Sequence, residues 1–391
     1  MGMYSDYLTK QMSFEQISQE RKVQLARIAF LRQREVVVYA GDIAKNIPIS
    51  SIDRSDFLPF KDQVEGLEGN KIDIILQTLG GLAEVVEDLV LLLRSRFTEV
   101  GVIVPGYAFS AGTIFSLAAD EILMSPTSSL GPIDAQIFSN GKRFSADAFL
   151  EGLYKIMKEA NENKGLNIAY IPILQNISPG EIQNCENAQN FSQTLVKRWL
   201  KQYKFKSWET HSSSGFPVTD DEKTSRAEEI AKALSKQSEW LTHGRSVKMP
   251  DLRQLGLQIT DYSCQPELSE AIDRYHTLLQ MSFETNLYKI YETQKTQILK
   301  FLNTPVALAQ KDTPKFQNPL IIQIPCGKCQ ATKTFQVNLD RLMPPVPEAI
   351  MFPSNNIFKC DGCGSENNLL GVRQQIELQT GRKIVNAENQ P

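Results

Sequence analysis

The sequence predicts an α/β protein with a parallel sheet, a helical extension and a small C-terminal domain that contains cysteines. Three observations lead to this fold class. Short apolar segments alternate with helical segments between residues 35 and 124, which is typical of a parallel sheet covered by helices. Glycines follow two of the apolar strands. Four of the six cysteines form two CxxC pairs near the C-terminal end.

The elements follow from the pattern of apolar residues. Residues 13–33 predict a helix, and the strands are expected at Glu35–Tyr39, Lys71–Thr78, Val100–Val104 and Ile122–Met124. Apolar helices are expected between them, at Leu82–Arg96 and Ser110–Ala119. Residues 145–305 are mainly helical in pattern, and Ser178 and Glu181 form a capping box that opens a helix through Tyr203.

These elements divide the chain into five segments. We expect an N-terminal helical segment over 1–34, an α/β domain over 35–265, a long helix and linker over 266–316, a cysteine domain over 317–373 and a frayed polar tail over 374–391. Within the cysteine domain, short strands are expected at Leu320–Ile324 and Thr332–Val337.

The composition excludes several classes of function. Of 391 residues, 41% are hydrophobic and 22% are charged, and the formal net charge is −3. Such a chain has no general attraction for nucleic acid. No uncharged apolar run reaches the roughly 18 residues of a membrane span, and Met1–Thr9 lacks the layout of a secretory signal. We expect a cytoplasmic protein that binds neither membranes nor nucleic acid.

Two motifs at the carboxyl ends of strands can carry chemistry. The first is Leu79-Gly80-Gly81-Leu82, where glycine lets the backbone turn sharply and approach a ligand. The second is Pro105-Gly-Tyr-Ala-Phe-Ser-Ala-Gly-Thr113, where a hydroxyl stands at the start of a helix. Each has a simpler interpretation, a tight turn for the first and a helix cap at Ser110 for the second. Together they mark the edge at which an open α/β sheet binds ligands.

The sequence around these motifs resembles the serine dehydrogenase proteinase family. The resemblance rests on Thr78-Leu-Gly-Gly81, Val102-Ile-Val-Pro-Gly-Tyr-Ala-Phe-Ser-Ala-Gly-Thr113, Ala118-Ala-Asp-Glu-Ile-Leu-Met124 and Ser129-Leu-Gly-Pro-Ile-Asp134, with a weaker match at Leu241-Thr-His-Gly-Arg245. It covers roughly residues 35–300. It implies the Clp-protease or crotonase-like fold, a parallel-sheet spiral of ββα units, and a relation to signal peptide peptidase A.

Carried over by position, the resemblance assigns Ser110 as the nucleophile and the amides of Gly81 and Ala111 as the oxyanion hole. It implies peptide hydrolysis through an acyl-enzyme, and thus a serine endopeptidase. Relatives with this fold form homo-oligomers, so we expect one here. Two alternatives remain: a catalytically silent oligomeric scaffold that binds protein partners, and a crotonase-type enzyme acting on acyl-CoA.

The general base stays open at this point. Clp proteases place a histidine where this chain has Ile133. Signal peptide peptidase A uses a lysine in a window that here holds Lys155, Lys158 and Lys164. The other candidate is His243. Together with Ser110 and Asp134 it would form a triad of nucleophile, base and acid, in which the histidine and the aspartate have exchanged their positions along the chain relative to Clp proteases.

The cysteine pairs are Cys326-Gly-Lys-Cys329 and Cys360-Asp-Gly-Cys363. Four thiolates in two CxxC turns satisfy a tetrahedral Zn²⁺ with no open position, so we expect a structural zinc ribbon; a redox pair is the main alternative. Residues 317–372 hold as many basic as acidic side chains. This balance favours docking of a protein or a peptide substrate over binding of nucleic acid.

Overall fold

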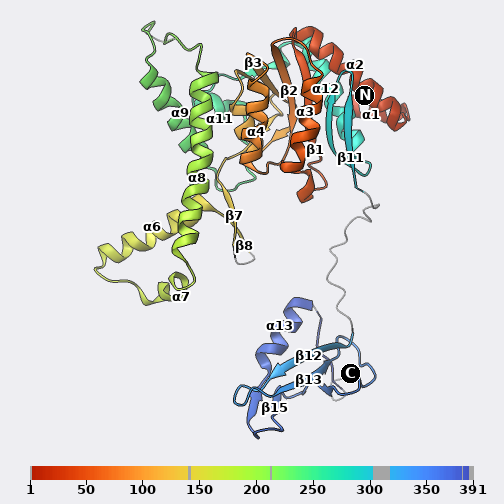
Figure 1. Ribbon diagram of the computed structural model, residues 1–391, viewed down its shortest axis with the longest axis vertical. Coiled ribbons are helices and arrows are strands. Elements are labelled where there is room, and N and C mark those ends of the chain that lie inside the picture. The colour runs from red at the N-terminus through yellow and green to blue at the C-terminus, as the bar shows by residue number, and fades with distance from the viewer. Residues whose placement is uncertain (1, 140–141, 212–213, 303–317, 381, 387–391) are drawn as a thin grey trace. The chain divides into compact units, whose positions relative to one another are not determined.

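The computed structural model describes residues 2–139, 142–211, 214–302, 318–380 and 382–386. The chain divides into two compact units, Met1–Pro305 and Val306–Pro391 (Figure 1). The division falls in the expected linker, most of which lies outside the described residues. No helix among the described residues is both long enough and apolar enough to cross a membrane.

A seven-stranded sheet forms the centre of the first unit, in the order β11-β10-β1-β2-β3-β5-β9. Five strands run parallel: β1 (Glu35–Gly41), β2 (Lys71–Gln77), β3 (Glu99–Val104), β5 (Glu121–Met124) and β9 (Thr260–Asp261). The two others, β10 (Leu287–Thr293) and β11 (Gln297–Phe301), extend the sheet in antiparallel fashion from β1. The four strands expected from the sequence are confirmed.

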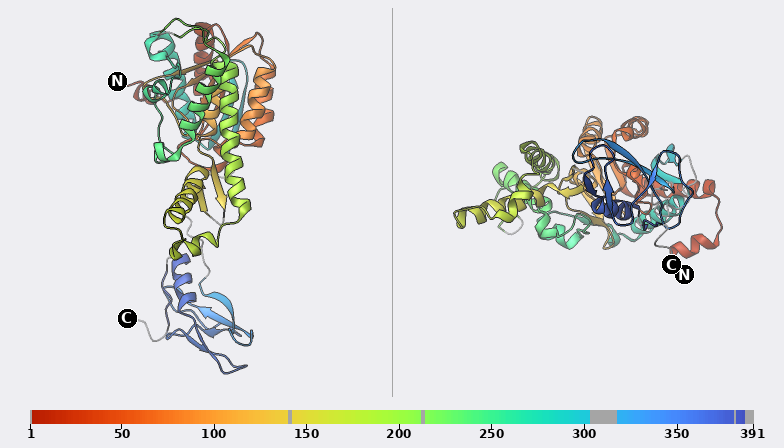
Figure 2. Two further views of the ribbon diagram at one scale, coloured as in Figure 1. Left: turned by 90° about the vertical axis from the view of Figure 1, so that its left-hand side faces the viewer. Right: turned by 90° about the horizontal axis from the view of Figure 1, so that it is seen from below.

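Helices cover both faces of this sheet (Figures 1 and 2). Alternate residues of each strand enter opposite cores, so that Val37 belongs to one hydrophobic cluster and Val38 to the other. The first face packs against α3 (Phe57–Glu65), α4 (Ala83–Arg94) and α5 (Ala111–Leu117). The second packs against α2 (Phe14–Arg32) and α12 (Pro266–Phe283). Burial on both faces explains why the strands are continuously apolar.

An arm projects from the sheet on the side of α4 and α5 (Figures 1 and 2). It consists of the hairpin β7 (Gln136–Ser139) and β8 (Lys142–Ser145), α6 (Ala146–Glu162), α7 (Ile171–Leu174) and the first half of α8 (Pro179–Trp199). The expected capping box between Ser178 and Glu181 opens α8, which continues as a π-helical turn over Leu200–Lys204.

Shorter elements complete the first unit. They are α1 (Met3–Thr9), β4 (Tyr107–Ala108), β6 (Ser129–Leu130), α9 (Asp220–Ser235), α10 (Gln237–Trp240) and α11 (Met249–Gln254). Strands β4 and β6 pair with each other outside the main sheet.

The expected long helix over 266–302 is wrong beyond Phe283, because β10 and β11 follow α12. The residues of β10, Leu-Tyr-Lys-Ile-Tyr-Glu-Thr, are rich in aromatic and β-branched types that fit a pleated surface. Strand β10 also supplies the edge of β1 with a hydrogen-bonded partner, with Val37 opposite Thr293. This pairing gives hydrogen-bond partners to the backbone N–H and C=O groups at the edge of β1, which would be unpaired if a helix followed instead.

The second unit is a small domain of short strands and one helix. It contains β12 (Leu320–Pro325), β13 (Thr332–Val337), β14 (Ile350–Met351), β15 (Ile357–Lys359), β16 (Glu366–Asn368) and α13 (Leu370–Thr380). The two expected strands are confirmed. The expectation of a frayed tail from residue 374 is wrong as far as Thr380, because α13 continues there and buries Ile376; Ile384 beyond it is also buried in the core around Phe335.

Candidate active site

Ser110 lies on a strained turn between a strand and a helix. Strand β3 ends at Val104 and α5 begins at Ala111, and between them Ser110 has φ 53° and ψ −117°. A non-glycine residue in such a conformation costs on the order of 1–3 kcal/mol and is concentrated at functional sites. A turn of this kind presents a hydroxyl outward at the top of a sheet.

The hydroxyl of Ser110 does not cap the helix. Ser110 occupies the N-cap position of α5, but its side chain makes no capping hydrogen bond. Within the part of the chain that the structure describes, no hydrogen bond uses this hydroxyl. The simpler interpretation of the motif, a helix cap, therefore does not account for this serine.

The diglycine turn lies directly against Ser110. A Cβ atom added at Gly80 would lie 2.7 Å from Cβ and 3.2 Å from Oγ of Ser110. Both glycines have positive φ, 112° at Gly80 and 145° at Gly81, which side chains other than hydrogen rarely allow. The two motifs are also hydrogen-bonded, because the Thr78 amide donates to Tyr107 O at 3.0 Å and the Phe109 amide donates to Thr78 O at 3.0 Å.

The backbone amides of Gly81 and Ala111 have no acceptor among the described residues, and neither does that of Ser110 itself. The amides that follow them are used: Leu82 donates to Ile52 O at 2.9 Å, and Gly112 donates to Phe109 O at 2.8 Å. Free amides on both sides of a serine hydroxyl can stabilise a negative charge on a substrate oxygen.

These groups line a common cavity of about 840 Å³. Ser110, Gly80, Gly81, Ala111 and Asp134 all contribute to its wall. Further parts of the wall come from the segment over residues 46–53, from the starts of α4 and α5, from the hairpin of β7 and β8 with the loop before it, and from helix α8. Its apolar side chains include Ile52, Leu79, Leu82, Ile114, Ile133, Ile137 and Phe191. The cavity thus combines apolar surface with a few converging polar groups, as binding sites commonly do.

The structure brings His243 and Asp134 together. Nδ1 of His243 lies 2.7 Å from Oδ1 of Asp134, whose carboxylate is fully buried and also accepts a hydrogen bond from Gln136 Nε2 at 2.8 Å. The imidazole is 23% exposed, and its Nε2 has no partner among the described residues. This contact orients the ring by Nδ1 and leaves Nε2 available for proton transfer.

Thr113 connects the serine helix to the loop of Asp134, a link that sequence reasoning missed. Its buried hydroxyl lies 2.8 Å from Ala108 O and accepts the Gly131 amide at 2.9 Å. Farther along that loop, Leu130 and Val247 exchange backbone hydrogen bonds of 3.0 and 2.8 Å, which hold the His243 segment beside it. A threonine three residues after the serine was the only local signal.

A family model of ClpP-like SDH-type serine proteinases matches residues 4–209, which is more than half of the chain. The chain belongs to this family. The matched range contains Ser110, the diglycine turn and Asp134, whereas His243 and the cysteine domain lie beyond it. The resemblance and the fold class inferred from the sequence are confirmed.

Two relatives of this chain are uncharacterized proteins of Methanocaldococcus jannaschii. One is 28% identical over 239 residues, which are 59% of this chain and 65% of the relative. The other is 26% identical over 253 residues, 62% of this chain and 76% of the relative. The chain thus spans less than two thirds of the first relative.

Solved structures with partial similarity include proteases. A mutant of the 1510-N membrane-bound stomatin-specific protease is 15% identical with a TM-score of 0.30, over 53% of this chain and 71% of that chain. A ClpP1 mutant from Listeria monocytogenes is 12% identical with a TM-score of 0.30, over 61% of this chain and 96% of that chain. These similarities are too low to transfer the roles of individual residues.

The three candidate lysines lie away from the cavity. Lys155 and Lys158 are on α6 with side chains 70% and 61% exposed, and they pair with Glu151 and Glu162. Lys164 follows the helix and is exposed as well. None of the three contributes to the described wall of the cavity; His243 does not either, but its partner Asp134 does. A lysine acts as a base only when burial or a nearby cation lowers its pKa, and these side chains are solvated.

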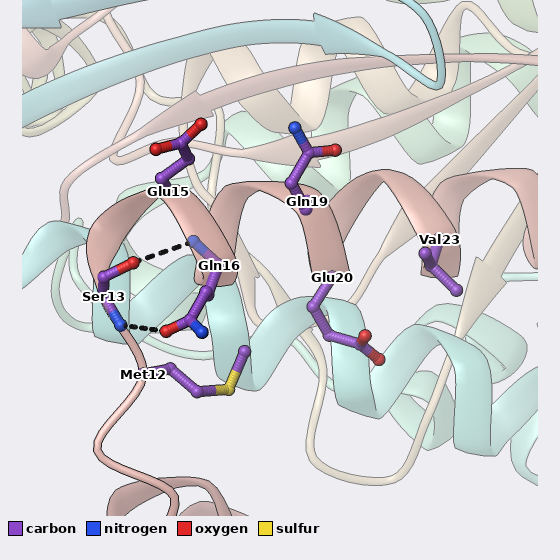
Figure 3. Close-up of a pocket in the computed structure, with 7 residues that line it drawn as sticks. All are labelled: Met12, Ser13, Glu15, Gln16, Gln19, Glu20 and Val23. Carbon is purple, nitrogen blue, oxygen red and sulfur yellow. Dashed lines mark hydrogen bonds between the residues drawn. The ribbon is translucent and has the colours of Figure 1, made fainter.

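A second hollow lies along the start of α2, lined by Met12, Ser13, Glu15, Gln16, Gln19, Glu20 and Val23 (Figure 3). Ser13 and Gln16 use their polar groups on each other, because Ser13 Oγ accepts the Gln16 amide at 3.2 Å and Gln16 Oε1 accepts the Ser13 amide at 2.8 Å. Ser13 is thus engaged in the capping box that opens α2.

The four clustered cysteines form a candidate metal site. Their sulfur atoms all lie within 4.8 Å of one another, with 3.7 Å between Cys326 and Cys363 and 3.6 Å between Cys329 and Cys360. Four ligands at a Zn–S distance of about 2.3 Å would be about 3.8 Å apart, so the spacing fits a tetrahedral ion. All four thiols are free.

The surroundings of Cys326 favour its thiolate, whereas the neighbouring cysteine sulfurs raise the pKa of Cys329 to about 11. Hydrogen bonding to the Ser365 hydroxyl and to the amides of Cys329 and Lys328 lowers the pKa of Cys326 to about 5. Asn367 Nδ2 lies 3.6 Å from the same sulfur. Donors around a ligand sulfur orient it and stabilise its charged, metal-binding form.

Proposed function

We propose that the chain is a serine peptidase that hydrolyses peptide bonds through an acyl-enzyme on Ser110. The observation that carries the proposal is the unbonded hydroxyl of Ser110 on a strained turn, in contact with Gly80 and flanked by two free amides. Membership of the SDH-type proteinase family supports the same activity.

The reaction would begin when Oγ of Ser110 attacks the carbonyl carbon of the substrate. As the Oγ–C bond forms, the amides of Gly81 and Ala111 hold the carbonyl oxygen as it becomes negative; one such donor is worth about 3–4 kcal/mol. His243 Nε2 accepts the serine proton and then donates it to the amine as the C–N bond breaks. Asp134 keeps the Nδ1–H tautomer in place.

The second half of the reaction uses the same groups. A water molecule attacks the acyl carbon, and its proton goes to Nε2 of His243. The proton returns to Ser110 Oγ as the acyl bond breaks, which releases the acid product and restores the enzyme. The exchanged order of histidine and aspartate along the chain does not affect these roles, because only their geometry matters.

A fluorophosphonate probe tests the proposal, since it labels an activated serine covalently. We expect the full chain to be labelled at Ser110 and Ser110→Ala to remain unlabelled and unable to cleave a fluorogenic peptide library. Ser116→Ala is the matched control, because Ser116 lies on the same helix but hydrogen-bonds Gly112 O at 2.9 Å. Equal labelling of wild type and Ser110→Ala would contradict Ser110 as the nucleophile, and a wild type that is not labelled would favour the silent scaffold.

We further propose that the four cysteines bind a structural Zn²⁺ and that the second unit docks protein substrates. The sulfur spacing supports the first point. The second is supported by large apolar side chains exposed on its strands and helix: Ile321, Ile350, Met351, Ile357 and Leu370. Apolar surface of this kind suits protein or peptide contacts better than nucleic acid.

The proteinase is proposed to be a cytoplasmic homo-oligomer. Free cysteine thiols arranged for a metal suit a reducing compartment. The arm exposes several large apolar side chains, among them Phe138, Tyr154, Met157, Ile168 and Ile173, which a second copy would cover. Light scattering should report a homo-oligomer for the full chain and dissociation for Met157→Glu; a monomeric wild type would contradict this part of the proposal.

A further inference from the structure

Strand β10 carries a buried lysine close to the diglycine turn. The side chain of Lys289 is 1% exposed, and its ammonium donates to Ser51 O at 2.7 Å, to Asp56 Oδ1 at 2.6 Å and to Asp53 Oδ2 at 3.3 Å. Lys289 lies outside the range matched by the family model, and the reaction described above does not use it.

The carboxylate of Asp56 forms the centre of this cluster. It is fully buried and accepts hydrogen bonds from the hydroxyls of Tyr39, at 2.6 Å, and Tyr291. It also accepts the backbone amide of Asp53 at 2.8 Å. A buried lysine, a buried carboxylate and two tyrosines therefore fix the segment from Ser51 to Asp53 at both ends.

That segment in turn holds Gly81. The Ile52 amide donates to Gly80 O at 2.8 Å, and Ile52 O accepts the Leu82 amide at 2.9 Å. A Cβ atom added at Gly81 would lie only 2.2 Å from Ile52 O, so the two backbones are in direct contact. The direction of the free Gly81 amide is consequently set by Ile52.

We infer that Lys289 is a positioning residue for the oxyanion hole, which it orders by holding Ser51 O and with it the backbone of Ile52 and Gly81. A buried ion pair is a poor way to stabilise a core, because desolvation offsets most of the attraction. Its directional bonds can instead specify one backbone arrangement. The inference rests on the proposed function, since it assigns Lys289 to the same site.

The same strand offers a matched control on its other face. Glu292 of β10 forms a fully buried ion pair with Arg21 at 2.9 Å and accepts the hydroxyl of Tyr275 at 2.6 Å. Side chains alternate along a strand, so this second pair lies among α2 and α12, whereas Tyr291 lies in the core on the face of α3. Loss of either pair should destabilise the fold, but only Lys289 is connected to the turn.

The experiment compares Lys289→Met with Arg21→Met in the full chain. We measure the second-order rate of fluorophosphonate reaction at Ser110, together with kcat and KM for a fluorogenic peptide. We expect Lys289→Met to lower the labelling rate and kcat about 10-fold or more, with KM little changed. A displaced oxyanion donor stabilises the transition state less, whereas binding of the substrate hardly depends on it. Arg21→Met should keep the wild-type rate in its folded fraction.

Amide hydrogen exchange gives a second readout. The amides of Ile52 and Leu82 should exchange faster in Lys289→Met than in Arg21→Met, because the first loosens the segment that pairs with the turn. If Lys289→Met does not fold, Tyr291→Phe and Tyr275→Phe provide the comparison, since each removes one hydroxyl from a buried carboxylate. Slower labelling of Tyr291→Phe alone supports the inference, and equal rates overturn it.

The proposed activity and the role of Lys289 can be tested separately. If wild type does not react with the probe at Ser110, the proposed function falls, and the role of Lys289 falls with it. If wild type reacts and the Lys289 and Arg21 variants react equally well per folded molecule, only the inference about Lys289 is overturned.

Discussion

His243 Nδ1 lies 2.7 Å from Oδ1 of Asp134, although 109 residues separate them in the chain. Asp134 lines the same cavity as Ser110, and Nε2 of the imidazole has no partner among the described residues. Of the bases considered from the sequence, His243 is therefore the one already oriented by an acidic partner beside the cavity.

Loss of His243 should remove most of the activity. General bases contribute about 10²–10⁴-fold to a rate, so we expect His243→Ala to lower kcat/KM by roughly that factor and Asp134→Asn to lower it as well, because the ring loses its orienting partner. His211→Ala is the matched control, since His211 contacts the exposed Glu222 at 3.1 Å instead of a buried carboxylate that lines the cavity. Kinetics with one fluorogenic peptide checks all three variants.

The lysines provide the opposing test of the base. Lys155→Ala, Lys158→Ala and Lys164→Ala should each retain wild-type kcat/KM, because their side chains are exposed to solvent. A large loss in any of them, with His243→Ala still active, would assign the proton transfer to lysine.

Gly80→Ala should abolish labelling of Ser110 while leaving the protein folded. The new methyl group would lie 2.7 Å from Ser110 Cβ, and φ is 112° at this position, so both the turn and the serine must shift. Gly66→Ala serves as the control, because nothing lies within 4 Å of its added Cβ. Normal labelling of Gly80→Ala would show that the contact is not needed for the reaction.

Removal of metal should affect only the second unit. We expect about one zinc ion per chain by elemental analysis, and its loss in Cys329→Ser, since binding of a structural zinc supplies folding free energy directly. Cleavage of a short peptide should persist, because Ser110 and its cavity lie in the first unit. Cys264→Ser, at an exposed single cysteine, is the control; zinc retained in Cys329→Ser argues against this site.

His276 should make the stability of the first unit depend on pH. Desolvation of this partly buried ring, which contacts Gln77 and Gln280, lowers its pKa to about 4. At a pH above about 6.5, the ordinary pKa of histidine, the ring is neutral in both the folded and the unfolded states. As the pH falls below this value, the ring binds a proton in the unfolded state before it does so in the folded state. The free energy of unfolding should therefore fall by about 2 kcal/mol between about pH 7 and about pH 5.

Urea unfolding at the two pH values measures this loss. His276→Gln cannot titrate and should show a smaller difference between them than wild type does. An equal difference in the two proteins would assign the pH dependence to other groups.

Several features could be predicted from the sequence because they depend on local pattern. Apolar runs such as Lys71–Gln77 identify strands buried on both faces, and the glycines after them require positive φ or close packing. Two CxxC pairs predict a cluster of four sulfur atoms regardless of the conformation of the segment that connects the pairs. These signals lie within a few residues, where chain geometry limits the conformations.

The sequence failed where a long-range partner decided the outcome. The residues after Phe283 were expected to continue a helix, and they form β10 because β1 offers an unpaired edge. The tail was expected to fray, yet α13 continues to Thr380 and Ile384 is buried beyond it, because Phe335 and its neighbours provide a core to pack against. In both cases burial in a distant element outweighs local propensity.

By itself, then, the sequence determined the α/β fold class, the serine and diglycine motifs and the cysteine cluster. Only the tertiary structure decided that Asp134 meets His243 rather than any of the three lysines, and that Lys289 holds a carbonyl 238 residues away at Ser51. The physical reason is that such contacts arise when strand pairing and core packing bring distant segments together, and no local pattern of residues encodes which segments will meet.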